Sequence, residues 1–90
     1  MTTDFNAVVA AVQEERTYQD ELHGSIQDAP HEMGTWILLI EAELNEAKLA
    51  LIKGGEGRNA LRAELVQVAA LCIAALEQHG LAAEHTGRAI

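Results

Sequence analysis

Apolar side chains recur every three or four residues over most of the chain, which is the spacing of one face of an α-helix. The pattern predicts a first helix over residues 4–23, with Thr3 or Asp4 as the N-cap and Gly24 as the stop. Short polar side chains favour helix starts, and glycine favours helix ends because it adopts left-handed backbone angles. The first quarter of the chain is therefore expected to be one helix.

Two further helices are expected after a loop over residues 24–30, which lacks periodicity and contains a proline. The second helix spans residues 33–53, where apolar positions repeat until a Gly-Gly pair ends the pattern. A short turn leads into the third helix over residues 59–79, with Asn59 as its N-cap. So short a turn predicts that the third helix runs back antiparallel beside the second.

The length of 90 residues is enough for about one domain, which excludes an organisation into two domains. Hydrophobic residues make up 49% of the chain and aromatic residues only 3%, and the 16 alanines favour helix. Residues 81–90 are expected to form a short fourth helix or to fray. The sequence thus predicts a single all-α domain over residues 1–90, an antiparallel bundle of three long helices with this C-terminal segment.

The charge and the single cysteine narrow the classes of partner. The net charge is -8, with 14 acidic and 6 basic residues, which argues against binding of nucleic acid or an anionic membrane. Cys72 alone excludes an internal disulfide and a multi-cysteine zinc site. The start of the chain lacks the features of a signal peptide, and charges or glycines interrupt the apolar runs. We therefore expect a cytoplasmic protein whose partner is a cation, a metal or another protein.

Carboxylates interrupt the apolar faces of the second and third helices. Glu43 and Glu46 share a side of the second helix with apolar residues, and Glu64 and Gln67 do so on the third. Burying an unpaired carboxylate costs several kcal/mol, so the charges need a partner. Arg or Lys can neutralise them, Mg²⁺ or Mn²⁺ can bind them, or the residues can be solvated surface charges.

At these residues the sequence resembles a known family. Glu43-Leu-Asn-Glu46 and Glu64-Leu-Val-Gln67, separated by 17 residues, are similar to the ExxE…ExxD signature of the MazG-like all-α nucleoside triphosphate pyrophosphohydrolases. Glu15-Arg16-Thr-Tyr-Gln19 followed by Gly24 resembles the opening of small phage and bacterial members, and a tryptophan precedes the acidic helix as in those proteins. The similarity covers roughly residues 14 to 79.

The resemblance implies an enzyme that cleaves a nucleoside triphosphate to the monophosphate and pyrophosphate with Mg²⁺, or with Mn²⁺. Glu43, Glu46 and Glu64 match the catalytic metal ligands, and Gln67 stands where the signature has Asp. A Gln oxygen can ligate Mg²⁺ without adding charge, which should weaken metal binding. Ala42 replaces a Glu found in many relatives. The alternative is a catalytically inactive module that binds nucleotide or a protein.

Three residues are candidates for binding the substrate. Trp36 shares the acidic face of its helix and can stack on a base, although a tryptophan at helical spacing also suits a core. Tyr18 and Gln19 can donate hydrogen bonds to a base or sugar, or can be ordinary surface residues. The four histidines show no spacing typical of a zinc site, and we assign them no catalytic role.

The third predicted helix is apolar around nearly its whole circumference between residues 65 and 76. A domain of this size buries only about 60–65% of its unfolded surface. Its own helices therefore cannot cover every side of this apolar helix, which predicts that a partner chain covers the rest. The small residues Ala69, Ala70, Ala74 and Ala75 would allow close approach there. The sequence therefore predicts, as the resemblance also implies, a homodimer or homotetramer.

Overall fold

The computed structural model describes residues 2–54 and 57–82, and within these ranges the chain forms helices and no strand. The elements are α1 (Phe5–His23), α2 (Met33–Lys53) and α3 (Gly57–His79). The all-α prediction and the three long helices are confirmed. Nearly all of the predicted C-terminal segment, from residue 83 onward, lies outside the described residues.

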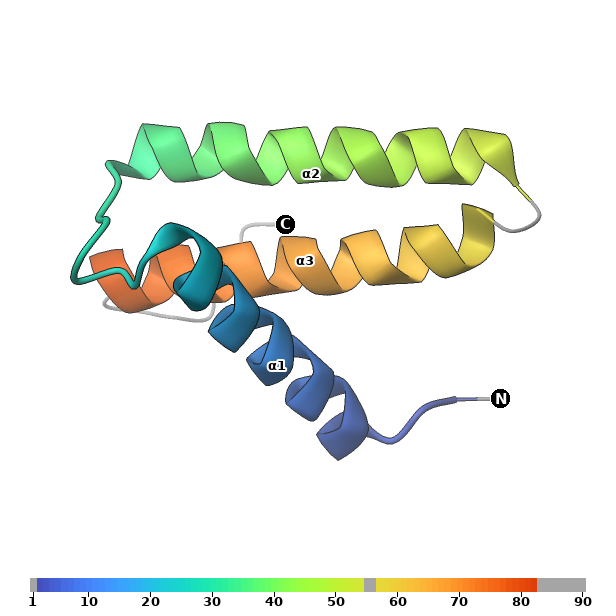
Figure 1. The fold of residues 1–90 in the computed structure, drawn as a ribbon, viewed down its shortest axis with the longest axis horizontal. Helices are drawn as coiled ribbons and strands as arrows, with labels where there is room; N and C mark the ends of the chain where they lie inside the picture. The colour runs from blue at the N-terminus through green and yellow to red at the C-terminus, as the bar shows by residue number, and fades with distance from the viewer. Residues whose placement is uncertain (1, 55–56, 83–90) are drawn as a thin grey trace.

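Figure 1 shows α2 and α3 side by side and antiparallel, as the short turn between them predicts. The α1 helix crosses this pair at a steep angle, and the C-terminal part of α1 contacts the C-terminal part of α3. In the described ranges no close backbone contact joins α1 to α2. The N-terminal half of α1 projects away from the helical pair. The fold is therefore a hairpin of the two long helices α2 and α3, with α1 packed against α3 at one end of the hairpin.

The helix ends follow the sequence signals with one exception. Asp4 is the N-cap of α1, where its carbonyl oxygen accepts a hydrogen bond from the backbone N–H of Val8 at 3.1 Å, and Gly24 ends the helix at φ 91°. Gly54 ends α2 at φ 63°. The predicted cap at Asn59 is wrong, because α3 begins at Gly57 and Asn59 lies in its first turn. Glycine at position 57 gave no helical signal, which explains the error.

Small side chains make up most of the core between α2 and α3. The buried apolar residues, several of them alanines, are Val12, Trp36, Ala47, Ala50, Ala70, Ala74 and Ala75. Alanines let two helix backbones approach closely, so the pair packs through a narrow seam. The expectation that Ala70, Ala74 and Ala75 face a partner chain is wrong, because they are already buried against the chain's own helices. Ala69 is half-buried.

Large apolar side chains remain on the outside. Among the described residues 17 of them are exposed, including Leu38 and Leu49 on α2 and Ile73 on α3. The segment Asn59–His79 of α3 is long and apolar enough, by length and composition, to cross a membrane. Arg62 and Glu64 interrupt this segment, as the sequence analysis notes for the apolar runs, and the core helix of a soluble protein meets the same criterion.

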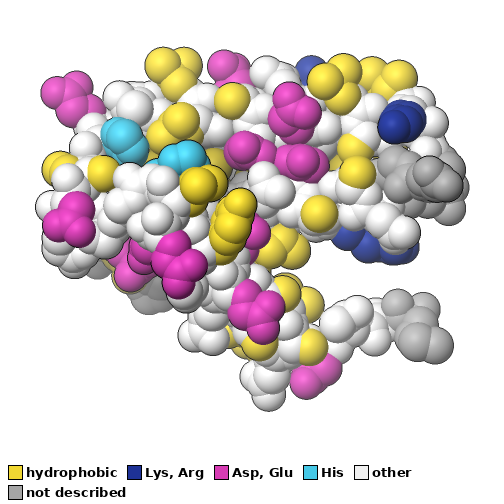
Figure 2. Space-filling model, viewed as in Figure 1, with side chains coloured by type: hydrophobic (Ala, Val, Ile, Leu, Met, Phe, Trp, Pro, Cys, Tyr) yellow, Lys and Arg dark blue, Asp and Glu magenta, His cyan; other side chains and the backbone are white. Residues whose placement is uncertain are grey.

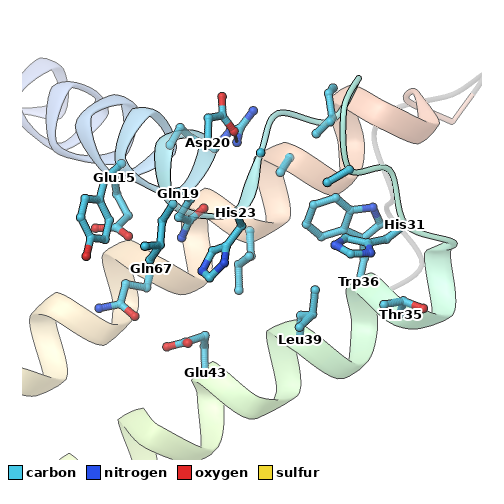
Figure 3. Close-up of a pocket in the computed structure, with 18 of the residues that line it drawn as sticks. Glu15, Gln19, Asp20, His23, His31, Thr35, Trp36, Leu39, Glu43 and Gln67 are labelled. Carbon is cyan, nitrogen blue, oxygen red and sulfur yellow. Dashed lines mark hydrogen bonds and ion pairs between the residues drawn. The ribbon is translucent and has the colours of Figure 1, made fainter.

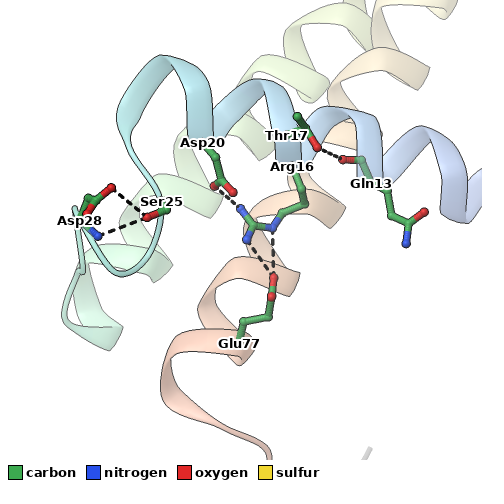
Figure 4. A network of polar contacts seen from close by, with 7 residues as sticks. All are labelled: Gln13, Arg16, Thr17, Asp20, Ser25, Asp28 and Glu77. Atoms are coloured by element: carbon green, nitrogen blue, oxygen red, sulfur yellow. Dashed lines mark hydrogen bonds and ion pairs between the residues drawn. The ribbon is translucent and has the colours of Figure 1, made fainter.

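Arg16 ties α1 to α3, as Figure 4 shows. Its Nη2 and Nε donate to Oε1 of Glu77 at 2.9 and 3.2 Å, and its Nη1 donates to Oδ1 of Asp20 at 2.8 Å. Charge-assisted bonds of this kind fix the orientation of a side chain as well as adding energy. The pair with Glu77 joins α1 to α3 where the C-terminal half of α1 forms one wall of a cleft.

Candidate functional site

A cleft of about 740 Å³ lies between the C-terminal half of α1, the loop that follows it and the inner faces of α2 and α3. Figure 3 shows carboxylate and amide groups, including Glu15, Glu43 and Gln67, toward one end, and His31 beside Trp36 toward the other. We call these the acidic end and the aromatic end. Figure 2 shows carboxylates gathered near the boundary of the helical pair, with two histidines close by.

The acidic end exists because α2 places a carboxylate on its buried stripe. Positions 36, 43, 47 and 50 fall on one side of the helix, and Trp36, Ala47 and Ala50 are buried there. Glu43 is half-buried between them. On α3, Glu64 is half-buried opposite, and its Oε2 atom is buried with no hydrogen-bond partner among the described residues.

The environment of Glu43 raises its pKa from the ordinary 4.5 to about 7. Burial is the largest cause, followed by a hydrogen bond to Glu64 and the negative charges of Glu64, Glu46 and Glu15. The carboxyl groups of Glu43 and Glu64 are therefore close enough to share a hydrogen bond when one is protonated. With both ionised, the buried oxygen of Glu64 has no donor, and the cluster has a deficit of positive charge.

The structure brings some of the four predicted metal-binding residues together and leaves one aside. Glu43 and Gln67 line the cleft, and the carboxyl of Glu64 lies beside that of Glu43. Glu46 is exposed, one turn along α2, and influences Glu43 through its charge alone. Within residues 2–54 and 57–82, no three His, Cys, Asp or Glu side chains are grouped closely enough to hold a metal ion as they stand.

The chemistry of the donor set nevertheless fits a hard divalent cation. Carboxylate and amide oxygens are the ligands that Mg²⁺ and Mn²⁺ prefer, and the buried oxygen of Glu64 lacks a partner. A bound cation would offset the negative charges of Glu64, Glu46 and Glu15, which add to burial in raising the pKa of Glu43.

The three predicted substrate-binding residues all line the cleft, in different states of burial. Trp36 is only 6% exposed, and its Nε1–H donates to Oε1 of Gln78 at 2.9 Å. Most of its indole therefore packs in the core, beside Ala74 and Ala75. Gln19 is half-buried on α1, and Tyr18 is 58% exposed at the rim.

The structure adds residues to which the sequence analysis gave no role at the site. Glu15 and His23 line the cleft from α1, and His31 lines it from the loop. Glu15 lies one helical turn before Gln19, so the spacing of four residues could have placed it on the same face. His31 and His23 stand alone in the sequence, and nothing in their spacing indicates a shared cleft.

Comparisons of the chain with protein-family models, curated proteins and solved structures found no match. The similarity to the MazG-like signature therefore rests on the acidic motifs of α2 and α3 and on the opening motif of α1. Of the residues that carry it, Glu15, Gln19, Trp36, Glu43 and Gln67 line the cleft, whereas Glu46 is exposed. The family assignment itself stays a prediction.

Proposed function

We propose that the chain is a metal-dependent pyrophosphohydrolase of nucleoside triphosphates, of the MazG-like kind. The observation that supports it best is the Glu43–Glu64 carboxyl pair, which has a buried unpartnered oxygen and lies at one end of a cleft with an aromatic other end. Perturbed carboxyls in a cleft are typical of functional sites. The protein would act in the cytoplasm on free nucleotides, with no nucleic acid or membrane as a partner.

The acidic end would hold the cation through Glu43, Glu46 and Glu64, with the side-chain oxygen of Gln67 as a neutral fourth ligand. A bound Mg²⁺ or Mn²⁺ supplies positive charge that neutralises the triphosphate and polarises the phosphorus that reacts. Without it, the carboxylates would repel the substrate. The unpaired oxygen of Glu64 supports this assignment, because no described side chain neutralises it.

Glu43 lines the cleft, and without a cation its pKa is about 7. A bound cation would lower this pKa, so Glu43 would be ionised and able to accept a proton. In the proposed reaction, the attacking water gives a proton to this carboxylate, and the oxygen of the water bonds to the α-phosphorus. The bond from that phosphorus to the bridging oxygen breaks, and pyrophosphate leaves.

The test is release of pyrophosphate from a panel of canonical and modified nucleoside triphosphates with Mg²⁺ or Mn²⁺. We expect Glu64→Gln and Glu46→Gln to reduce the rate by about 100-fold or more, as removal of charge stabilisation does elsewhere. Glu41→Gln is the matched control, because Glu41 is exposed on α2 and does not line the cleft. Folded wild-type protein that releases no pyrophosphate from any substrate would contradict the proposal.

A second candidate is a module that binds nucleotide without cleaving it. It is favoured by the exposed position of Glu46, by the lack of a ready group of three ligands in the described ranges, and by Gln67 in place of Asp. Gln67→Asp separates the two candidates. If the protein is an enzyme, this change should leave the rate of hydrolysis intact or raise it. In the module, nucleotide binds and stays intact, and Glu46→Gln is neutral or stabilising.

We also propose that the chain assembles as a homodimer or homotetramer through its outer apolar surface. Leu38, Leu49 and Ile52 are 65%, 60% and 79% exposed, and they fall on one side of α2, opposite the buried stripe. Apolar surface of this extent on a small domain is typical of an interface. Burial of apolar surface stabilises an assembly by about 25 cal/mol for each Å² that a partner covers.

Light scattering during size-exclusion chromatography tests the assembly. We expect a mass of two or four chains for the wild type, and 9.7 kDa for the doubly substituted Leu38→Glu, Leu49→Glu protein with its helicity retained. Leu81→Glu is the control, since Leu81 is 70% exposed beyond the end of α3. A folded wild-type monomer at about 100 μM would contradict the assembly, since standard interfaces bind more tightly than this.

A further inference from the structure

The side chain of Gln78 binds the segment after the loop to the C-terminal end of α3. Its Oε1 accepts hydrogen bonds from the backbone N–H of His31 at 3.0 Å and from Nε1–H of Trp36 at 2.9 Å. Its Nε2 donates to the carbonyl oxygen of His31. A side-chain nitrogen of His79 lies 2.9 Å from the same carbonyl oxygen. One amide therefore holds both backbone groups of His31 across 47 positions of the sequence.

The ring of His31 is held on a second side by Trp36. The two rings lie edge to face, with centroids 4.9 Å apart and planes at 82°. This geometry is favourable for aromatic pairs. Since the backbone is bound to Gln78 and the ring rests on the indole, the imidazole has little freedom to move.

The imidazole itself is left available to the cleft. His31 is half-buried and lines the cleft, and among the described residues no hydrogen bond reaches either nitrogen of its ring. A neutral imidazole carries one donor and one acceptor. Leu39 and Leu71 also line the cleft, and Leu71 packs against the cluster of Trp36, while Thr35 and His23 add polar groups to the lining. A few fixed polar groups on an apolar wall are typical of a site for a small planar ligand.

We propose that the aromatic end binds the nucleobase, with His31 as the residue that determines base preference and Gln78 as the residue that positions it. The identity of the ring as a nucleobase rests on the proposed function. The donor and acceptor of the imidazole complement the polar edge of such a ring. Trp36 supports His31 from behind rather than acting as the main stacking surface, since it is 6% exposed.

The direct test uses the fluorescence of Trp36, the single tryptophan of the chain. The purified protein is titrated with nucleosides, with nucleoside triphosphates and with inorganic tripolyphosphate, each in Mg²⁺. We expect nucleosides and triphosphates to change the emission, because the ring reaches His31 beside the indole. Tripolyphosphate, bound at the acidic end, should leave it unchanged. A response to tripolyphosphate as large as that to nucleotides, or no response to any nucleoside or nucleotide, would overturn the inference.

The variant His31→Ala sharpens this test. Gln78 contacts only the backbone of His31, so the substitution leaves those hydrogen bonds in place. Loss of one hydrogen bond to the base should weaken nucleotide binding about 3- to 10-fold and reduce the differences between bases. Calorimetry should show tripolyphosphate binding unchanged. Equal affinities of the variant and the wild type for every nucleotide would contradict the role of His31.

Gln78 requires variants that separate positioning from folding. Gln78→Ala should reduce base discrimination, and Gln78→Glu, which keeps the acceptor for the two N–H donors, should restore part of it. Loss of folding without recovery in Gln78→Glu would make Gln78 merely structural. Base-dependent binding without hydrolysis would contradict the proposed enzyme but support the binding of the base beside His31. Hydrolysis with unaltered base preference in His31→Ala would support the enzyme but contradict the role of His31.

Discussion

The two ends of the cleft differ in how completely their polar groups are paired. At the aromatic end, the amide of Gln78 satisfies the indole N–H of Trp36 and both backbone groups of His31. At the acidic end, a buried oxygen of Glu64 has no donor among the described residues, and the pKa of Glu43 is raised to about 7. The chain completes one end by itself, and the other lacks positive charge.

This difference indicates which end depends on a ligand. A buried polar atom without a partner costs about 1–3 kcal/mol, so few are kept in folded proteins. In the proposed function, a cation that joins the site would pair this oxygen of Glu64. The paired groups around Gln78 serve to hold a fixed wall. Variants at the two ends should consequently have opposite effects on stability.

The largest effect on stability is expected for Gln78→Ala. The change leaves the Nε1–H of Trp36 and the backbone N–H of His31 without partners, so the free energy of unfolding should fall by about 2–3 kcal/mol. Urea denaturation measures it, and Gln13→Ala, at an exposed position of α1, is the control. A loss no larger than in the control would show that the aromatic end does not depend on this amide.

The opposite sign is expected for Glu64→Gln in the absence of divalent ions. The substitution removes one of two adjacent charges, and the N–H group of the new amide can donate a hydrogen bond to the carboxyl of Glu43. The free energy of unfolding should rise by about 1 kcal/mol, the usual contribution of a hydrogen bond. Denaturation in a chelator measures it. A clear loss of stability would show that the acidic end is complete without a cation.

The pH dependence should follow from Glu43. Its pKa is about 7 in the folded chain and 4.5 in the unfolded chain, so between these values the folded state binds more protons. Stability from this group is present below the lower value and is lost as the pH rises through the higher one. Without metal, the Tm of the wild type should fall from about pH 5 to about pH 8 relative to Glu43→Gln. Parallel curves would contradict the raised pKa.

The smallest effect is expected where Arg16 meets Glu77, outside both ends. The Glu77 side chain is 51% exposed, and exposed ion pairs contribute about 0.2–1 kcal/mol. Glu77→Gln should therefore lower the free energy of unfolding by no more than this, and less at high salt. Denaturation at two salt concentrations measures it. A larger, salt-independent loss would mean that the attachment of α1 depends on this pair.

The sequence predicted the helices well, because their signals are local. The bounds of α2 agree with the prediction, and Gly24 and Gly54 end their helices with positive φ angles. The start of α3 was missed, since Gly57 lowers helix propensity where the helix begins. The seam of buried alanines was assigned to a partner chain because periodicity cannot tell which neighbour covers an apolar face.

The site was predictable only in part, for a related reason. Helical geometry placed Glu43 on a buried stripe, and that position is confirmed. Glu46 was expected on the same side, but three further residues turn it by about 60° to an exposed position. The contacts of Gln78 join residues 42 and 47 positions apart, and no pattern along the chain indicates such pairs.

Calorimetric titration with Mn²⁺ tests most directly whether a cation completes the acidic end. We expect Mn²⁺ to bind the wild type and His31→Ala equally, and we expect Glu64→Gln and Glu43→Gln to lose this binding. Glu41→Gln, at the exposed control position on the same helix as Glu43, should bind like the wild type. Equal Mn²⁺ affinity in Glu64→Gln, Glu43→Gln and the wild type, or no binding to the folded wild type, would contradict it.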